Sequence, residues 1–303
     1  MMEKTDFQRK IADLLPDIQM KFAEPMAKHT SFRIGGPVTV MVFPENREQL
    51  AKVLKVSALL DKKYRILGAG TNVLASDDGL DEIIICLKDC FDGIKQIDDT
   101  RIRVAAGVTM SRAAVFAANL GLGGMEFAHG IPGTVGGGVY MNAGAYDGDI
   151  SKICESVSVM RMDGEIVEYS AEEMQFSYRH SRLEEEPSIV ISAVFALEKK
   201  PEVDIKAKMQ ELLKRRKTSQ PLDLPSAGSA FKRPVGGYAA ALIDEAGLKG
   251  YRVGDAAVSE KHAGFVVNLG KATAEEVRLL LKDVSDKVYD RTSIRLEPEM
   301  RIW

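Results

Sequence analysis

The sequence predicts an α+β protein in which glycine-rich loops join short strands to amphipathic helices. Residues 48–60 carry Leu50, Val53 and Leu54 at helical spacing, and a short strand at 64–67 follows and ends abruptly in glycines. Pro201 then precedes a further helical stretch at 203–217, which indicates a new domain. We expect an N-terminal segment at 1–28, a first domain at 29–200 with subdomains near 29–90 and 91–200, and a second domain at 201–303.

The remaining elements are predicted from periodicity and end signals. Gly121 can close a helix over 109–120 at its C′ position, and Asp163-Gly164 is a hairpin turn. Thr273 and Glu276 have the spacing of a capping box ahead of an apolar helix. Strands are expected at 82–87, 101–108, 157–162, 165–169, 189–198 and 293–302, and the segment 125–148 reads as a structured loop region.

Composition excludes several classes of protein. The chain has 303 residues, with 41 basic and 44 acidic side chains and a formal net charge of −3, which provides no field for a nucleic acid or an anionic membrane. Cys86, Cys90 and Cys154 complete no zinc pattern, so we expect reduced structural thiols and no metal. No segment resembles a signal peptide or a membrane span. We therefore expect a cytoplasmic protein without an evident protein partner.

Two common nucleotide-binding motifs are incomplete in this sequence. Gly68-Ala69-Gly70 follows a strand, but the third glycine of a dinucleotide fingerprint would fall at Val73. Gly270-Lys271-Ala272 lacks the upstream glycine, at Phe265, and the hydroxyl residue of a P-loop. Neither a Rossmann site nor ATP chemistry is expected.

Two glycine loops can still bind a pyrophosphate, since successive backbone N–H groups in one concavity bind anionic oxygens. They span residues 68–72 and 130–138, and the second continues into Tyr140-Met141-Asn142-Ala143-Gly144-Ala145-Tyr146. Either loop alone is more typical of a tight turn between buried strands. Together they favour a large phosphate-bearing cofactor.

A series of motifs resembles, in order, those of the UDP-N-acetylenolpyruvoylglucosamine reductase family, from His29 to Trp303. They are the blocks 29–37 (HTSFRIGGP), 67–74, 130–146, 176–181 (FSYRHS), 228–232 (GSAFK), 246–250 (AGLKG), 259–268 and 296–300 (LEPEM).

This resemblance implies a two-part FAD-binding domain of the vanillyl-alcohol-oxidase (PCMH) type and an α+β substrate-binding domain after it. It implies noncovalent FAD, with NADPH as cosubstrate, and the Gly-Thr-Asn block keeps the hydroxyl of the more usual Gly-Ser-Asn. The implied cofactor-binding residues are Arg33, Gly68, Ala69, Gly70, Thr71, Asn72, Gly133, Thr134, Gly136, Gly137, Asn142 and Ala143.

The implied reaction in peptidoglycan precursor synthesis adds a hydride from flavin N5 to C3 of the enolpyruvyl ether, and a proton to C2. Arg179 can hold the substrate carboxylate through two parallel hydrogen bonds, although such an arginine alone is more often a structural ion pair. Ser229, by itself a turn residue, is the implied proton donor. Glu299 is the implied catalytic or orienting acid, and Glu297 would face the same side of a regular strand.

Substrate contacts are less specific. Tyr178, Lys232, Lys261 and His262 are candidates that solvated or packing roles would also explain. Arg233 stands where the family pattern commonly has asparagine, so it could approach the diphosphate instead. The short stretch between Arg179 and Ser229 resembles the subclass that lacks a tyrosine-bearing loop over the uridine.

Two alternatives stay open. A flavin oxidase of the same fold could attach FAD covalently through His129, the histidine beside the second glycine loop. A non-catalytic nucleotide-sugar binding module would keep the glycine loops but has no need for Arg179, Ser229 and Glu299. Release of FAD by acid would argue against the covalent oxidase, and oxidation of NADPH in the presence of the enolpyruvyl substrate would argue against the binding module.

Overall fold

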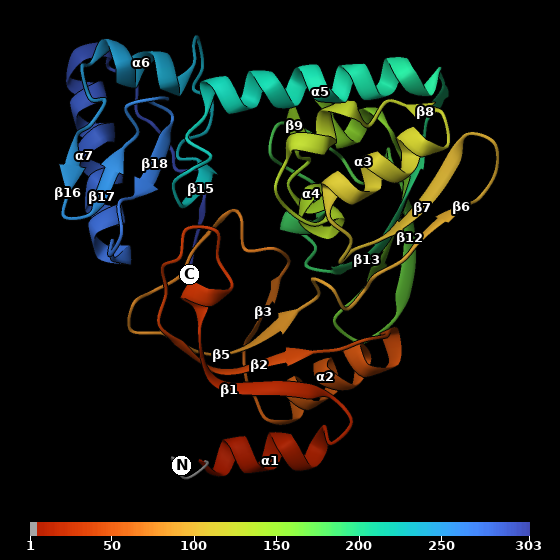
Figure 1. Cartoon of the computed structure of the whole chain (residues 1–303). Coiled ribbons are helices and arrows are strands. Elements are labelled where there is room, and N and C mark those ends of the chain that lie inside the picture. Colours follow the sequence, from red (N-terminus) through yellow and green to blue (C-terminus); the bar gives the residue numbers. More distant parts are fainter. Residues whose placement is uncertain (1–4) are drawn as a thin grey trace. The chain divides into compact units, whose positions relative to one another are not determined.

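The computed structural model describes residues 5–303, which fold into two compact units (Figure 1). The described part of the first unit comprises residues 5–22, Val40–Ala69 and Glu82–Lys214, and the second unit comprises Ala23–Thr39, Gly70–Asp81 and Arg215–Trp303. The units interleave in sequence, whereas the domain boundaries expected at 28 and 200 are linear and stay a prediction. The first four residues of the expected N-terminal segment lie outside the described part.

A five-stranded sheet with the order β12-β11-β13-β7-β6 organises the first unit. Its hairpin pairs Val157 with Tyr169, which confirms the turn predicted at Asp163-Gly164. The strands are β6 (Ile94–Gln96), β7 (Arg101–Ala105), β11 (Cys154–Met160), β12 (Ile166–Ser170) and β13 (Ile189–Ala196).

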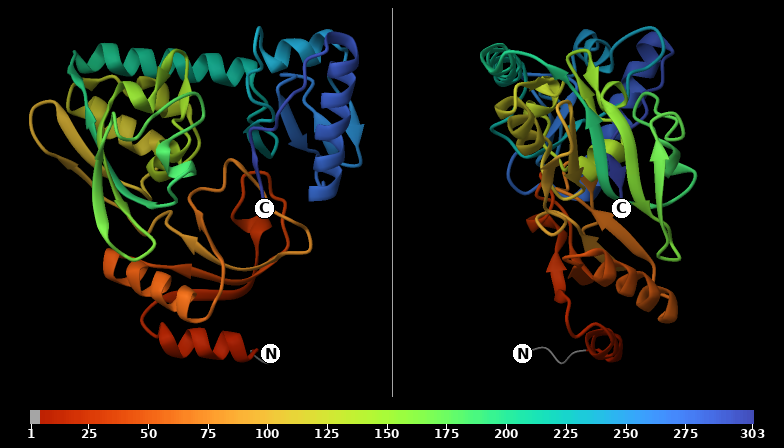
Figure 2. Two further views of the ribbon diagram at one scale, coloured as in Figure 1. Left: turned by 180° about the vertical axis from the view of Figure 1, so that it is seen from behind. Right: turned by 90° about the vertical axis from the view of Figure 1, so that its right-hand side faces the viewer.

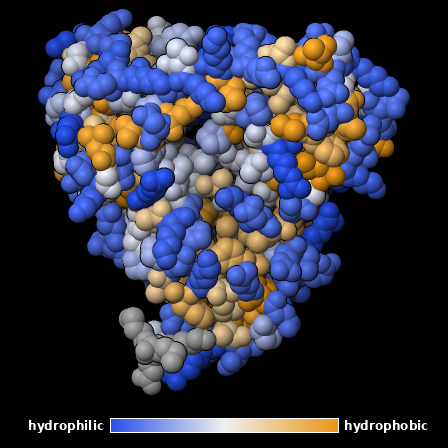
Figure 3. Space-filling view, viewed as in Figure 1, coloured by the Kyte–Doolittle hydropathy of each residue, from blue (hydrophilic) through white to orange (hydrophobic). Residues whose placement is uncertain are grey.

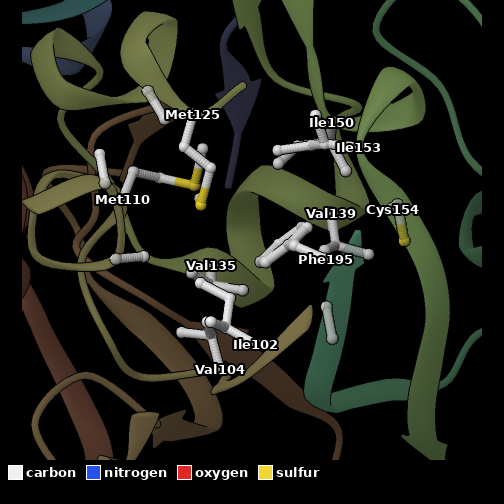
Figure 4. Packing of buried hydrophobic residues seen from close by; sticks show 14 of the residues in the cluster. Ile102, Val104, Met110, Met125, Val135, Val139, Ile150, Ile153, Cys154 and Phe195 are labelled. Carbon is white, nitrogen blue, oxygen red and sulfur yellow. The ribbon is translucent and has the colours of Figure 1, made fainter. Parts of the chain in front are cut away.

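Helices α3 (Met110–Asn119) and α4 (Val135–Tyr140) help to form the main core of this unit. α4 packs on β13 and β7, and Figure 4 shows its Val139 beside Phe195 and its Val135 near Ile102. All four side chains are fully buried. This packing fixes the position of α4, which lies in one of the glycine-rich segments.

A second core in the first unit forms around α1 (Asp6–Leu14), α2 (Arg47–Leu59) and part of a four-stranded sheet. The order of this sheet is β1-β2-β5-β3, and β3 pairs in parallel with β5, Tyr64 opposite Ile83. Its strands are β1 (Gln19–Pro25), β2 (Pro37–Phe43), β3 (Tyr64–Leu67) and β5 (Leu80–Cys86). The loop at 68–72 leaves directly from the end of β3.

The second unit contains the sheet β15-β18-β17-β16, with α7 packed on β16 and β17 and α6 against α7 (Figure 2). Buried aliphatic residues of α7 at helical spacing, Val277, Leu281, Val284 and Val288, form much of its core. The elements are β15 (Ser226–Ser229), α6 (Ala239–Glu245), β16 (Arg252–Val253), β17 (Ala256–Val258), β18 (Phe265–Asn268) and α7 (Ala274–Thr292).

The long helix α5 (Glu202–Ser219) and several short elements complete the described chain. The short elements are η1 (Met26–Lys28), β4 (Val73–Leu74), β8 (Leu122–Gly123), η2 (Glu126–Gly130), β9 (Gly144–Ala145), β10 (Gly148–Asp149), η3 (Ile150–Lys152), η4 (Arg182–Glu184), β14 (Glu198–Lys199) and β19 (Arg301–Ile302).

The predicted helices are confirmed as α2, α3, α5 and α7, and so is the capping box of α7. The loop predicted at 130–138 is partly wrong, because Thr134 caps a helix that begins at Val135. The strand predicted at 293–302 is also wrong. Ser293 ends α7 with φ +58°, and only Arg301–Ile302 is regular strand. The strand predicted over 101–108 ends at Ala105.

Hydrophilic residues predominate on the face seen in Figure 3. Among residues 5–303, no helix is both long enough and apolar enough to span a bilayer. That same part of the chain also holds no cluster of three metal-ligating side chains.

Candidate active site

The glycine loop after β3 lies against the start of α4 within the first unit. A Cβ atom on Gly68 would lie 2.4 Å from Oγ1 of Thr134, so this approach requires glycine. Thr134 caps α4 by accepting a hydrogen bond from the amide of Gly137. Two segments predicted as cofactor-binding are thus brought together.

Backbone amides of these segments divide into two groups. The amides of Val135 and Gly136 donate to the carbonyls of Val108 and Ala106, at 2.8 and 2.9 Å. By contrast, the amides of Gly68, Ala69 and Gly133 donate no hydrogen bond to any described residue. The second group is available to an anionic ligand.

Arg179 lies in a tight turn of the first unit. Ser177 and His180 pair with each other across it, and Arg179 between them has φ +58°. The guanidinium lies over the Tyr178 ring at 5.0 Å from its centroid. His180 forms a 2.7 Å hydrogen bond with Glu185, which raises the pKa of the His180 imidazole.

Ser229 and Glu299 lie on adjacent backbone segments of the second unit. The amide of Glu299 donates to the carbonyl of Ala230 at 2.9 Å, and Phe231 forms a bridge with Pro298. Both Ser229 and Glu299 are partly exposed, so solvent and ligand can reach them. Glu297, the other carboxylate considered, forms an ion pair with Lys232.

The other candidates of the second unit differ in their surroundings. The Arg233 guanidinium lies 4.5 Å from the centroid of Tyr238, and Nζ of Lys261 donates to the carbonyl of Lys217 at 2.6 Å. Burial lowers the pKa of His262, whose Nδ1 accepts a hydrogen bond from the amide of Gly264. Arg233 and Lys261 are exposed, and His262 is partly buried.

The rest of the glycine loop also belongs to the second unit, where Gly70, with φ +63°, packs against the carbonyl of His29. The Asn72 carbonyl accepts from the amide of Arg301 at 2.9 Å, and its side chain donates to the carbonyl of Glu299 at 3.4 Å. Arg33 has φ +57° and is exposed. The loop therefore contacts the segment that carries Glu299.

Comparison with known proteins defines the class. Residues 38–170 match the family model described as FAD binding domain, and residues 220–303 match the model of the C-terminal domain of UDP-N-acetylenolpyruvoylglucosamine reductase. The first model contains the glycine loops, and the second contains Ser229 and Glu299. The protein is an FAD-dependent oxidoreductase.

Similarity to full-length relatives is high. UDP-N-acetylenolpyruvoylglucosamine reductase from Caldicellulosiruptor saccharolyticus is 45% identical over 97% of this chain and 94% of its own length. The same-named protein of Syntrophomonas wolfei is 42% identical over 97% and 98%. The crystal structure of the Thermus caldophilus reductase matches with a TM-score of 0.79 at 36% identity, covering 94% of this chain and 98% of that one. The chain belongs to the UDP-N-acetylenolpyruvoylglucosamine reductase family, and the expected fold class is confirmed.

The residues present fit FAD. A pyrophosphate needs several N–H donors in one concavity, and Gly68, Ala69 and Gly133 offer unused amides on two segments that touch. Gly136 and Gly137, predicted beside them, use their amides within the protein. Gly68, Ala69 and Gly133 would therefore hold the diphosphate.

Sequence reasoning missed two residues that support the site. Ser181 is fully buried and donates from Oγ to the carbonyl of Tyr140 at 2.8 Å. Asp77 accepts from the amides of Ala274 and Glu275 at the start of α7, at 2.7 and 3.3 Å. No local sequence pattern around Ser181 or Asp77 predicts its hydrogen-bond partner, so these roles become visible only in the folded structure.

Proposed function

We propose that this protein reduces UDP-N-acetylenolpyruvoylglucosamine to UDP-N-acetylmuramate, with noncovalently bound FAD and with NADPH as reductant. The observation that carries the proposal is the pairing of the Ser229 and Glu299 segments within the matched C-terminal domain. The Ser229 hydroxyl and the Glu299 carboxyl belong to partly exposed residues on these two adjacent segments. Bound FAD supplies the hydride that the enolpyruvyl group accepts at C3.

Arg179 would bind the substrate carboxylate. Hydride addition leaves negative charge on C2 that spreads into this carboxylate, so a guanidinium bound there stabilises charge that is largest in the transition state. Arg179 is partly exposed and its guanidinium is permanently charged, and both properties support this role.

Ser229 would donate the proton to C2, and Glu299 would orient or protonate the same group. A carbanion-like centre is basic enough to take a proton from a weak acid held close to it. Tyr178, Lys232, Arg233, Lys261 and His262 are proposed as substrate contacts. Arg33, Gly70, Thr71, Asn72, Thr134, Gly136, Gly137 and Ala143 are proposed as further residues of the cofactor region.

We place the reaction in the cytoplasm. The three cysteines are free, and burial raises the pKa of Cys90 to about 11 and that of Cys154 to about 12. These thiols stay protonated and unreactive at neutral pH, which supports a structural role in a reducing compartment.

Ser229→Ala tests the proton donor by separating the two half-reactions. Reoxidation of the reduced flavin by the enolpyruvyl substrate should slow by ~10²–10⁴-fold, because the proton donor is lost. Reduction of the flavin by NADPH should keep its wild-type rate. Stopped-flow absorbance of the flavin measures both steps. Equal slowing of the two steps would show that Ser229 shapes the site and donates no proton.

Arg179→Ala tests the carboxylate contact. Turnover with the enolpyruvyl substrate should fall by about 10–10²-fold, since hydrogen bonds to charged groups contribute about 1.5–3 kcal/mol. Arg179→Lys should recover part of the loss, because it keeps the charge without the bidentate geometry. Steady-state kinetics and flavin content are measured together. Loss of FAD in place of turnover would move Arg179 to the cofactor.

A further inference from the structure

The turn that carries Arg179 has an uncommon conformation. Arg179 adopts φ +58°, a region that residues with a Cβ atom seldom occupy. The two hydrogen bonds between Ser177 and His180 are long, at 3.2 and 3.3 Å. The turn therefore needs support from outside to keep this geometry.

Asn142 provides the first support. The residue is 6% exposed, its Nδ2 donates to the carbonyl of Ser177 at 2.9 Å, and its Oδ1 accepts from the amide of Ser151 at 2.9 Å. Both ends of this amide are thus engaged within the protein. The φ of Asn142 is +41°, which asparagine tolerates better than most residues.

Ser181 provides the second support. Its hydroxyl, which is fully buried, donates at 2.8 Å to the carbonyl of Tyr140, one of the last-turn carbonyls of α4 that lack a helical partner. The residues on either side of the Arg179 turn, Ser177 and Ser181, are therefore both attached to the C-terminal end of α4. The N-terminal end of the same helix lies against Gly68.

We propose that Asn142 is a positioning residue for Arg179, and that its side chain acts on this turn and not on the cofactor. Core packing of Val135 and Val139 holds α4 in place, and Asn142 and Ser181 transmit that position to the turn (Figure 4). The inference rests on the proposed function, because it requires that Arg179 bind the substrate carboxylate.

Asn142→Asp is the most selective test. Aspartate keeps the size, tolerates the positive φ and still accepts from the Ser151 amide, but it loses the donor to the Ser177 carbonyl. We expect the affinity of the oxidised, FAD-loaded protein for UDP-N-acetylenolpyruvoylglucosamine to fall by about 10–10²-fold, the scale expected for a misplaced group. Affinity for UDP-N-acetylglucosamine, which has no carboxylate, should not change. Calorimetry measures both. Equal losses for both ligands would overturn the proposal.

Ser181→Ala and Ser57→Ala form a matched pair that does not depend on Asn142→Asp folding. Both serines are buried in the first unit, and each donates to a backbone carbonyl at 2.8 Å, Ser57 to Val53 within α2. Ser181→Ala should weaken binding of the enolpyruvyl substrate only, and Ser57→Ala should weaken neither ligand. If both variants behave alike, the anchoring of the turn has no special role.

A double-mutant cycle separates this inference from the proposed function. Once Arg179→Ala has removed the guanidinium, adding Asn142→Asp should cause little further loss of substrate affinity. A full additional loss would show that Asn142 acts independently of Arg179, and the positioning role would be wrong. If Arg179→Ala alone leaves substrate affinity and turnover unchanged, the assignment of Arg179 is wrong, and this inference is overturned with it.

Discussion

At Gly68 the protein leaves no room for a side chain. The space that a Cβ would fill is occupied by Oγ1 of Thr134, and it is this close approach that brings the unused amides of Gly68 and Gly133 onto touching segments. The sequence predicted Gly68 as a cofactor residue from the family motif. Its second role is to let the loop approach the cap of α4, and the motif does not predict that Thr134 is the contacting residue.

Gly68→Ala should therefore weaken FAD binding. The added methyl group must displace Thr134, and overpacking of this kind typically costs about 1–3 kcal/mol. Flavin absorbance relative to protein absorbance, and the melting temperature, should both fall. Gly93→Ala is the control, because a Cβ there meets nothing within 4 Å. Full flavin content and an unchanged melting temperature in Gly68→Ala would contradict this reading.

The N-terminus of helix α7 is capped both by neighbouring residues and by a residue far away in sequence. Its capping box, Thr273 with Glu276, was predicted from spacing and is present. The capping of Ala274 and Glu275 comes from Asp77, far away in sequence but in the same compact unit. A carboxylate here also interacts favourably with the helix dipole. Asp77 thus fastens the segment after the glycine loop to the helix that forms the core of the second unit.

Asp77→Ala should destabilise the second unit by about 1 kcal/mol, the usual effect of losing an N-terminal cap. The melting temperature should fall by roughly 1–2 °C in a chain of 303 residues, because the unfolding entropy grows with chain length. Asp78→Ala is the matched control, since it removes a neighbouring, exposed carboxylate of the same charge. Differential scanning calorimetry compares them. Equal shifts for both variants would mean that lost charge, not lost capping, explains the effect.

For the whole molecule, bound FAD should add to the free energy of unfolding. A ligand that binds only the folded protein adds RT ln(1 + [L]/Kd), about 2.7 kcal/mol at a hundredfold excess over Kd. His129, the residue through which a covalent flavin could form, instead contacts Ser111, with 3.2 Å between Nδ1 and Oγ. The family match supports FAD as the cofactor, and the proposed noncovalent attachment has a direct consequence for unfolding.

Removal of FAD should lower the melting temperature, and added FAD should restore it. Acid precipitation should release all flavin into the supernatant, and His129→Ala should retain the same flavin content. Absorbance spectra of pellet and supernatant measure this directly. Yellow colour that stays with the denatured protein would favour the covalent oxidase alternative.

Elements whose signals are local could be predicted from the amino-acid sequence alone. The periodicity and caps of α2, α3 and α7 and the hairpin at Asp163-Gly164 depend on residues three or four positions apart, so they are legible without the fold. The order of the family motifs was equally legible and led to FAD and to the candidate residues.

Tertiary structure decided the pairings between segments distant in sequence. Val73 pairs in parallel with Arg301, and the side chain of Asn142 donates to the carbonyl of Ser177, two residues before Arg179. The segment predicted as one long terminal strand is mostly irregular after Ser293. A sequence pattern predicts which polar groups need a hydrogen-bond partner. It does not predict which distant residue provides that partner, because the two come together only in the folded chain. For that reason the chemistry of Arg179 could be expected from its motif, whereas the geometry that aims it could not.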